Sequence, residues 1–167
     1  EGAEDSFIRT LSQMQDDLRR DYVTGAYNAV YLNEQYRPIA ERAAMSGTPV
    51  GVVMVRVNEY WQLREHESDS AANCCLNMAA GILQLAVGPD HDKAVLARLN
   101  DGFFAIVTIG TPAARMAQTV REAMNDSRRE FNISLSRRGS FTAEIASAEW
   151  GETASWDMTL SLAQQRL

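Results

Sequence analysis

Residues 94–108 read AVLARLNDGFFAIVT, which is two apolar runs separated by the tripeptide Asn-Asp-Gly. β-branched and aromatic side chains favour extended strands, whereas Asn, Asp and Gly tolerate the backbone angles of tight turns. The stretch therefore predicts a β-hairpin. A second stretch, VGVVMVRV at residues 50–57, is almost continuously apolar and predicts a strand that is buried on both faces.

Helical periodicity surrounds these strands, because apolar residues recur at steps of three and four. The expected helices cover residues 5–22, 29–44, 69–87 and 112–125, with a short terminal one from about Ser155. Residues 131–136 and 140–148, joined by a turn at 137–139, predict a second hairpin. This order of elements predicts an α/β sandwich with a mixed sheet and helices on its faces.

The composition is that of about one globular domain with enough apolar residues to form a core. The chain has 167 residues, of which 46% are hydrophobic, and a net charge of −6. An acidic chain is poorly suited to nucleic acid, whose phosphates require a basic surface. No uninterrupted apolar run is long enough to span a bilayer, so we expect no membrane contact by this segment itself. The adjacent Cys74 and Cys75 suit neither a disulfide nor a zinc site, which favours the reducing cytoplasm.

Four sequence blocks, in order and at family spacing, resemble the GGDEF domain, the diguanylate cyclase fold of bacterial cyclic di-GMP signalling. The blocks are DYVTGAYNA at 21–29 for the family's D-x-L-T-G-L-x-N-R, RVNEYW at 56–61 for D-x-D-x-F-K, ARLNDGFFA at 97–105 for A-R-x-G-G-[DE]-E-F-A, and FTAEIASA at 141–148 for the late strand. The resemblance implies a GGDEF or nucleotidyl-cyclase-like sandwich, with a central mixed five-stranded sheet flanked by helices. It also implies a signalling helix over residues 1–20 and a GGDEF domain over 21–167 whose C-terminal helix is truncated.

The departures from the family pattern remove its chemistry. In the family, two Mg²⁺ ions are held by an Asp at the end of the first strand and by an acidic residue in the signature turn. The matching residues here are Arg56 and Gly102, and the next signature carboxylate is Phe103. Mg²⁺ needs oxygen ligands, and a guanidinium can neither supply them nor lose its proton near pH 7. The resemblance therefore implies no catalytic residue, no metal site and no cofactor.

Other residues that handle the nucleotide in the family are replaced as well. Arg64 and Asn73 match the guanine-reading Asn and Asp, and Trp61 matches the phosphate-contacting Lys. We use the term signature-site positions for the full set of matching residues: Arg56, Asn58, Trp61, Arg64, Asn73, Asn100, Asp101, Gly102 and Phe103. The R-x-x-D motif of product-inhibited cyclases matches residues 91–94, His-Asp-Lys-Ala, which lack both the Arg and the Asp.

Two alternatives stay open at the signature-site positions. Arg56, Arg64 and Arg98 could form a metal-free pocket for an anion or nucleotide, or Arg56 could simply pair with Glu59 or Asp101. The aromatic residues Trp61 and Phe103 could form an apolar patch for a protein partner, or fill the old cleft.

The expected function is that of a catalytically inactive GGDEF-type domain, a regulatory or protein-interaction module in a bacterial cyclic di-GMP signalling protein. One alternative is a sensor that binds GTP or cyclic di-GMP without turnover. Another is an enzyme with a rearranged site, whose nearest carboxylates are Glu59, Glu65, Asp69 and Asp101. The expected partner is a protein or a neighbouring domain of the same chain, such as an EAL domain or a membrane-anchored sensor. A homodimer through the N-terminal helix and a cytoplasmic location are also expected.

Overall fold

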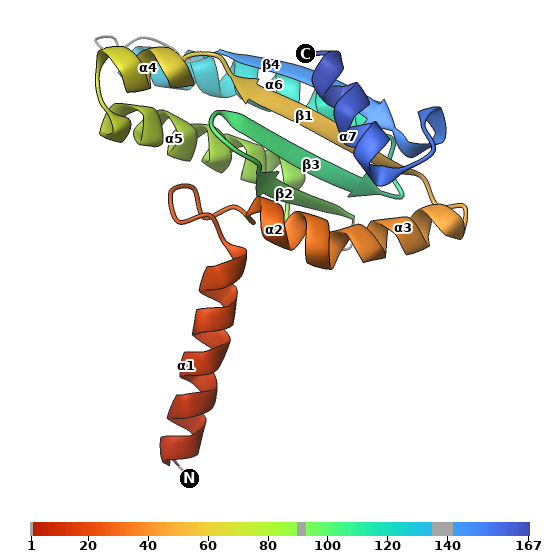
Figure 1. Cartoon of the computed structure of the whole chain (residues 1–167). Helices are drawn as coiled ribbons and strands as arrows, with labels where there is room; N and C mark the ends of the chain where they lie inside the picture. The colour runs from red at the N-terminus through yellow and green to blue at the C-terminus, as the bar shows by residue number, and fades with distance from the viewer. Residues whose placement is uncertain (1, 90–92, 135–141) are drawn as a thin grey trace.

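The molecule consists of an α/β sandwich and one helix that projects from it (Figure 1). The computed structural model describes residues 2–89, 93–134 and 142–167. The helices and strands are α1 Gly2–Arg19, α2 Ala29–Tyr31, the π-helical turn η1 Leu32–Tyr36, α3 Arg37–Met45, β1 Val50–Val57, α4 Tyr60–His66, α5 Asp69–Val87, β2 Ala94–Arg98, β3 Phe103–Ile109, α6 Ala113–Ser134, β4 Ala143–Glu149, the 3₁₀ turn η2 Trp150–Glu152 and α7 Trp156–Gln165.

The strand β1 lies in the interior of the sheet, as its almost continuously apolar sequence predicts. The strand order is β2-β3-β1-β4, and each neighbouring pair is antiparallel. The expected mixed five-stranded sheet is therefore wrong for the described residues, which form four antiparallel strands. Within the ranges that the structure describes, the one parallel pairing is an isolated bridge between Tyr27 and Ala97 at the outer edge of β2.

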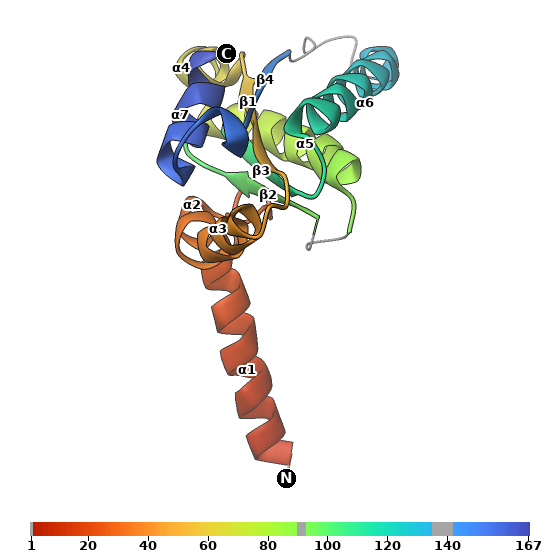
Figure 2. The ribbon, with the colours of Figure 1, turned by 90° about the vertical axis from the view of Figure 1, so that its right-hand side faces the viewer.

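Helices cover both faces of the sheet, and each layer has its own apolar core (Figure 2). Alternate residues of β1 point to opposite faces: Val53 and Val55 pack toward α5 and α6, whereas Val52 and Met54 pack toward α3 and α7. At Gly51 an added Cβ would lie 2.5 Å from the Cβ of Ala113, so α6 approaches β1 closely there. The expected α/β sandwich fold is confirmed.

Side-chain caps fix the starts of three helices. Asn28, Ser68 and Ser155 each accept a hydrogen bond from a backbone N–H three residues later, at the starts of α2, α5 and α7. The strand at 50–57 and the helix at 69–87 have the bounds expected from sequence. The helical segment expected over 29–44 is present as α2, η1 and α3 in succession.

Two expectations about local structure need correction. The second hairpin is wrong in its first half, because residues 131–134 continue α6. Residues 135–141 lie outside the described residues. The strand expected over 140–148 is present as β4 Ala143–Glu149 in the part of it that the structure describes. Helix α4 was not expected at all. Its only buried residue is Tyr60, so the segment has no apolar stripe that could reveal a helix.

Helix α5 is the one helix of the described chain that is long and apolar enough to cross a membrane by length and composition. Its apolar residues Ala72, Leu76, Ala79 and Leu83 are buried within the sandwich against the sheet and α6. In this structure it is a core helix.

Candidate functional site

The turn between β2 and β3 forms the centre of the signature site, and it packs tightly against the end of β1. The backbone N–H of Val57 donates to the Gly102 carbonyl at 2.8 Å, and the N–H of Phe103 closes the turn on the Asn100 carbonyl at 2.9 Å. A Cβ added at Gly102 would lie 2.9 Å from the Cβ of Tyr60 and 3.0 Å from the Val57 carbonyl. The position that matches a family metal ligand therefore has no room for a side chain without local movement.

Arg56, the second position that matches a metal ligand, pairs in register with Phe103 of β3 and Glu144 of β4. Its Nε donates to the Asn58 side-chain oxygen at 3.3 Å. The expected ion pair of Arg56 with Glu59 or Asp101 is wrong, because both carboxylates bind other groups. The end of β1 thus presents a cation where the resemblance places a carboxylate.

Glu59 and Asn58 hold the start of β4 through Thr142. The Glu59 carboxylate accepts from the backbone N–H and from the hydroxyl of Thr142, both at 2.7 Å. Asn58 donates from its side-chain amide to the same hydroxyl at 3.0 Å and from its backbone to the Thr142 carbonyl at 3.0 Å. Both side chains therefore have structural partners.

Helix α4 presents an aromatic and cationic surface beside the turn. The Arg64 guanidinium lies 3.4 Å from the Asp69 carboxylate and 3.9 Å from that of Asp101. It also lies over the Trp61 ring, 5.4 Å from the ring centroid. Trp61 is 48% exposed, so it does not fill a cleft. Trp61 could have formed an apolar surface patch or filled the old cleft, and its exposure agrees with the surface patch.

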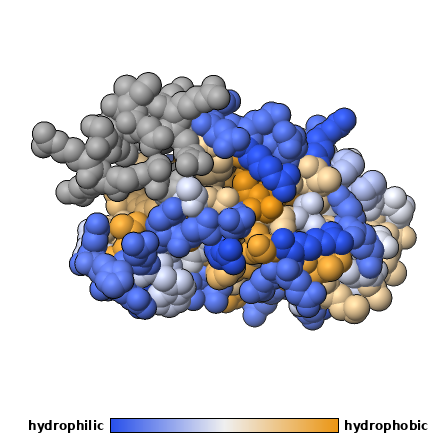
Figure 3. All heavy atoms as spheres, turned by 90° about the horizontal axis from the view of Figure 1, so that it is seen from above, coloured by the Kyte–Doolittle hydropathy of each residue, from blue (hydrophilic) through white to orange (hydrophobic). Residues whose placement is uncertain are grey.

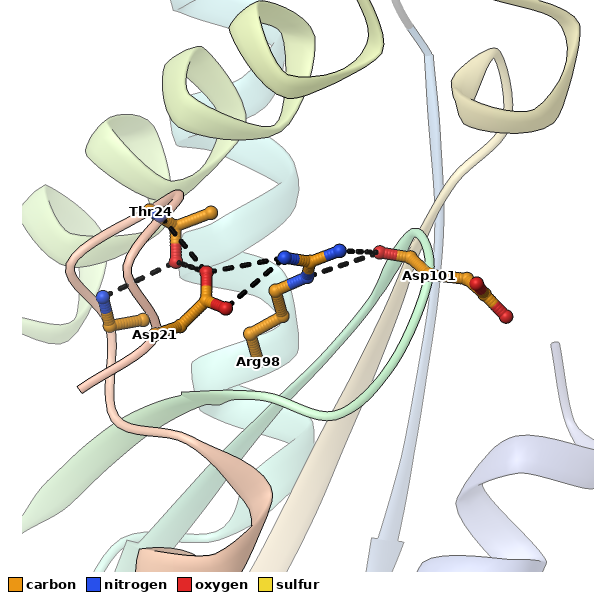
Figure 4. A network of polar contacts seen from close by, with 5 residues as sticks. Asp21, Thr24, Arg98 and Asp101 are labelled. Carbon is orange, nitrogen blue, oxygen red and sulfur yellow. Dashed lines mark hydrogen bonds and ion pairs between the residues drawn. The ribbon is translucent and has the colours of Figure 1, made fainter. Parts of the chain in front are cut away.

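Arg98 lies on the opposite side of the turn and joins it to the segment after α1 (Figure 4). Its Nη1 donates to the Asp21 carboxylate at 3.1 Å, and its Nε and Nη2 donate to the Asp101 carbonyl at 3.2 and 3.1 Å. The same carboxylate accepts from the backbone N–H and hydroxyl of Thr24. With only 14% of its side chain exposed and its donors engaged, Arg98 acts here as a structural clamp.

The expected anion-binding residues are thus engaged in different ways. Arg64 and Arg98 both contact Asp101, the former through its carboxylate and the latter through its carbonyl. Asp101 adopts a φ of +46°, which lets its two oxygen-bearing groups face different partners. The side chain of Arg64 is 44% exposed and therefore more accessible than that of Arg98, which is 14% exposed. Asn73 lies half-buried on α5, and residues 91 and 92 of the absent R-x-x-D motif lie outside the described residues.

No group of three or more His, Cys, Asp or Glu residues suited to a metal ion occurs among the described residues. Three of the four carboxylates considered for a rearranged site have other partners, since Glu59 binds Thr142 and both Asp69 and Asp101 face Arg64. The face of the molecule that includes α4 and β4 carries many hydrophilic residues, with a hydrophobic area near its middle and others toward its lower left and right-hand side (Figure 3). The site can bind charged or aromatic groups at its surface, but the donor set does not suit Mg²⁺.

Sequence reasoning missed the partners that are distant along the chain. The Asp21–Arg98 pair spans 77 residues and the Glu59–Thr142 pair spans 83. Each pair joins two of the family blocks, 21–29 with 97–105 and 56–61 with 141–148, so the blocks were the available signal for both pairs. The blocks alone do not specify which side chains of two blocks contact each other.

Solved structures of low sequence identity share this fold. The coiled coil and GGDEF domain of DgcB from Caulobacter crescentus, in complex with cyclic di-GMP, has a TM-score of 0.80 at 19% identity, over 98% of this chain and 86% of that one. The GGDEF domain of FimX from Pseudomonas aeruginosa has a TM-score of 0.72 at 19% identity, over 88% and 90% of the two chains. The S helix-GGDEF-EAL portion of Vibrio cholerae LapD, bound to cyclic di-GMP, has a TM-score of 0.74 at 15% identity, over 96% of this chain and 36% of that one.

No curated protein is significantly similar to the chain in sequence. The family model described as "Diguanylate cyclase, GGDEF domain", however, matches residues 18–167. This range includes the sheet, the helices that cover it and the turn with the signature-site positions. The chain belongs to the GGDEF family.

Proposed function

We propose that this GGDEF domain performs no cyclase chemistry and serves as a regulatory or protein-interaction module of a cyclic di-GMP signalling protein. The observation that carries the proposal is the pair of residues at the matching metal positions. Arg56 is a permanent cation, and Gly102 has no side chain and no space for one without movement of Tyr60 or the Val57 backbone.

The electrostatic cost of placing Mg²⁺ beside Arg56 is large. At an effective dielectric constant of about 20, two unit positive charges about 4 Å apart repel by about 4 kcal/mol, and a divalent ion doubles this. Phosphoryl transfer relies on metal ions to neutralise the charge that develops on the phosphates. A site that repels the metal therefore opposes the reaction as well as metal binding.

The accessible surfaces support an interaction role. Helix α1 projects from the sandwich and exposes the apolar residues Phe7, Ile8, Leu11, Met14 and Leu18 on one stripe. Apolar stripes of this kind pack against other helices. We propose that α1 receives a signal from a second copy of the chain or from a neighbouring domain, and that the domain lies in the cytoplasm.

Solved structures of other proteins show which domains and protein partners occur together with GGDEF domains. LapD combines a GGDEF domain with an S helix and an EAL domain, and SiaD from Pseudomonas aeruginosa was crystallised with its activator SiaC. These arrangements are compatible with the proposal that the present domain acts through a neighbouring domain or a protein partner.

The direct test is incubation of the purified chain with GTP and Mg²⁺ or Mn²⁺, followed by chromatography for cyclic di-GMP. We expect no product above the level of a buffer control. A chain with Arg56→Asp and Gly102→Asp, which places carboxylates at both matching positions, tests whether these two residues alone account for the loss. Formation of cyclic di-GMP by the unaltered chain would refute the proposal.

A second candidate function is a nucleotide sensor without turnover, which the exposed Trp61 and Arg64 favour. An aromatic face and an adjacent guanidinium can contact a base and a phosphate. Titration calorimetry with GTP, GDP and cyclic di-GMP tests it, with Arg64→Gln as the variant and Arg115→Gln on α6 as a matched control. The absence of binding at millimolar ligand would remove this candidate.

A further inference from the structure

The outer edge of β4 is covered by side chains, whereas the outer edge of β2 is covered by backbone. At β2, the Tyr27 backbone N–H donates to the Leu96 carbonyl at 3.2 Å, and the Tyr27 carbonyl accepts from the Arg98 N–H at 2.8 Å. Among the residues that the structure describes, no such backbone partner lies along the outer edge of β4. An open strand edge can pair with another strand, so the covering of β4 bears on association.

Alternate residues of β4 direct their backbone groups away from the sheet. The Asn58 N–H donates to the Thr142 carbonyl, so residue 142 faces β1, and in an antiparallel ladder the even-numbered residues after it do the same. The N–H and carbonyl groups of Ala143, Ile145 and Ser147 therefore point to the outer edge. These three residues carry the groups that β4 offers to a further strand.

Two arginines, from helices on opposite faces of the sheet, occupy two of the outward carbonyls. Arg121 of α6 donates from Nη2 to the Ile145 carbonyl at 3.0 Å. Arg166, directly after α7, donates from Nη1 to the Ser147 carbonyl at 2.7 Å and forms an ion pair with Glu152. The N–H groups of Ile145 and Ser147 make no hydrogen bond within the described part of the chain. The edge thus has free donors, while two of its acceptors are engaged.

The edge is suited to pairing with the same edge of a second copy. About a two-fold axis at Ile145, the two Ile145 residues would exchange both backbone hydrogen bonds, and Ala143 of each chain would do so with Ser147 of the other. Glu144 would then lie opposite Ala146, so no like charges would face each other. This register requires the carbonyls of Ile145 and Ser147, which are the two that the arginines occupy.

We propose that the outer edge of β4 is a pairing surface for the same edge of a second copy of the chain, and that Arg121 and Arg166 keep it closed. Both arginines are exposed, so water can replace the carbonyls as partners of their guanidinium groups. Once the guanidinium groups leave, the edge has donors and acceptors in the alternation that an antiparallel strand needs. This surface is separate from the apolar stripe of α1 and from the signature-site positions.

The test removes both arginines in a full chain whose α1 stripe carries added charge. Leu11→Lys and Met14→Lys form this background, because they place charges among the exposed apolar residues of α1. Arg121→Gln and Arg166→Gln are then added together, and sedimentation velocity over a range of concentrations measures association. We expect the background chain to stay monomeric and the double arginine variant to form a dimer whose share rises with concentration.

Amide hydrogen exchange, followed by NMR, tests where the two copies meet. In the dimer the exchange of the Ile145 and Ser147 amides should slow by about fivefold or more, since each N–H gains a hydrogen bond. The matched control carries Arg37→Gln and Arg115→Gln, which remove the same amount of charge from α3 and from the first turn of α6. This control should remain monomeric, with unchanged exchange at both amides.

A proline on the edge provides the reverse test. Ser147→Pro, added to the double arginine variant, removes an outward N–H and should restore the monomer, because sheets tolerate proline where the N–H faces outward. Circular dichroism checks that this variant folds. Ala143→Pro, at the first residue of β4, serves the same purpose if Ser147→Pro does not fold.

A double arginine variant that stays monomeric at every concentration overturns the proposal. Association that persists in the folded proline variant also overturns it, as does association that leaves the exchange of Ile145 and Ser147 unchanged, because the contact then lies elsewhere on the molecule. The proposed function fails on a separate measurement, the formation of cyclic di-GMP from GTP.

Discussion

Gly102 shows how a single residue can define what a site is able to bind. Any side chain here begins with a Cβ that lies 2.9 Å from the Cβ of Tyr60 and 3.0 Å from the Val57 carbonyl. The close contact is with backbone and with a buried aromatic residue, neither of which moves easily. The turn is therefore adapted to the absence of a side chain.

We predict that Gly102→Asp destabilises the chain by about 1–3 kcal/mol, because overpacking forces the neighbours to shift. Urea unfolding followed by circular dichroism measures the loss. Gly102→Ala should show a similar loss, since the conflict begins at Cβ. Gly81→Ala is the matched control: nothing lies within 4 Å of its added Cβ, and a helix interior favours Ala over Gly by about 0.5–1 kcal/mol. Equal stability of the Gly102 variants and the unaltered chain would contradict the prediction.

The adjacent cysteines differ sharply in their surroundings, as expected for neighbours on a helix. Cys74 is exposed, whereas Cys75 is buried and its burial raises the pKa of its thiol to about 12. Because the thiolate is the reactive form, we predict that the folded chain reacts with one equivalent of a maleimide and the urea-unfolded chain with two. Mass spectrometry counts the adducts. Cys74→Ser should give no adduct in the folded state, and rapid double labelling of the native chain would be the contrary result.

The residue positions of the site followed from the sequence, but their partners did not. The family blocks placed Arg56 beside the turn, and the register with Phe103 agrees. The sequence could not show that Glu59 binds Thr142, because that contact depends on how the start of β4 returns to the end of β1. Nor could it show that the donors of Arg98 are already engaged.

At the level of elements, strands were easier to predict than the ends of helices. β1 has the expected bounds because eight consecutive residues suit a central strand and Pro49 precedes them. Residues 131–134 alternate in polarity like a strand, yet they extend α6. Extending an existing helix costs less than starting a new element, and a short alternating pattern does not reveal this cooperativity.

The C-terminal helix α7 is held at both ends by polar contacts. At its start, the Trp156 indole donates to the Asn33 side chain in the π-helical turn at 3.0 Å. At its end, Arg166 forms an ion pair with Glu152 of η2 and donates to the Ser147 carbonyl at 2.7 Å. These contacts connect the start of α7 to η1 and its end to η2 and β4.

The ion pair between Arg166 and Glu152 predicts that the stability of the folded chain depends on pH. Hydrogen bonds from Arg166 and from the Glu149 backbone lower the pKa of Glu152 in the folded chain. The stabilisation is therefore present above the unfolded pKa, about 4.3 for Glu, and is lost as the pH falls through the lower folded value. Arg166→Gln should melt at a lower temperature than the unaltered chain at pH 7, and this gap should narrow below about pH 4.3.

Glu152→Gln provides the control for that experiment, because it removes the titrating group and keeps Arg166 bound to the Ser147 carbonyl. Its melting temperature should approach that of the unaltered chain at acidic pH. The difference in melting temperature between Arg166→Gln and the unaltered chain could instead stay constant at every pH. That result would contradict the prediction and assign the whole loss of stability to the hydrogen bond with Ser147.

At the level of the whole molecule, the projecting α1 is the largest departure from a closed globular shape (Figure 1). Leu18 is 77% exposed and Phe7 is 64% exposed, and the other apolar residues of the stripe are open as well. Burying such side chains contributes about 1.5–3 kcal/mol each when they are fully covered. A partner helix would therefore gain substantial binding energy from this stripe.

We predict that the chain forms a dimer whose population rises with concentration, as measured by sedimentation equilibrium. The double variant Leu11→Lys, Met14→Lys should sediment as a monomer at the same concentrations, because it places charges within the stripe. Gln13→Lys, on a different face of α1, adds charge outside the stripe and should retain the dimer. Identical association of both variants would show that α1 is not the interface.

The close packing of the turn on α4 also bears on how this chain can change over evolutionary time. A lineage that acquired an acidic side chain at position 102 would first need a smaller residue than Tyr60 beneath it, and that step alone would open a void in the core. Each of the two mutations is costly without the other. The shape of this small contact therefore opposes the appearance of a carboxylate at position 102, whereas substitutions at the exposed surface of α4 meet no such barrier.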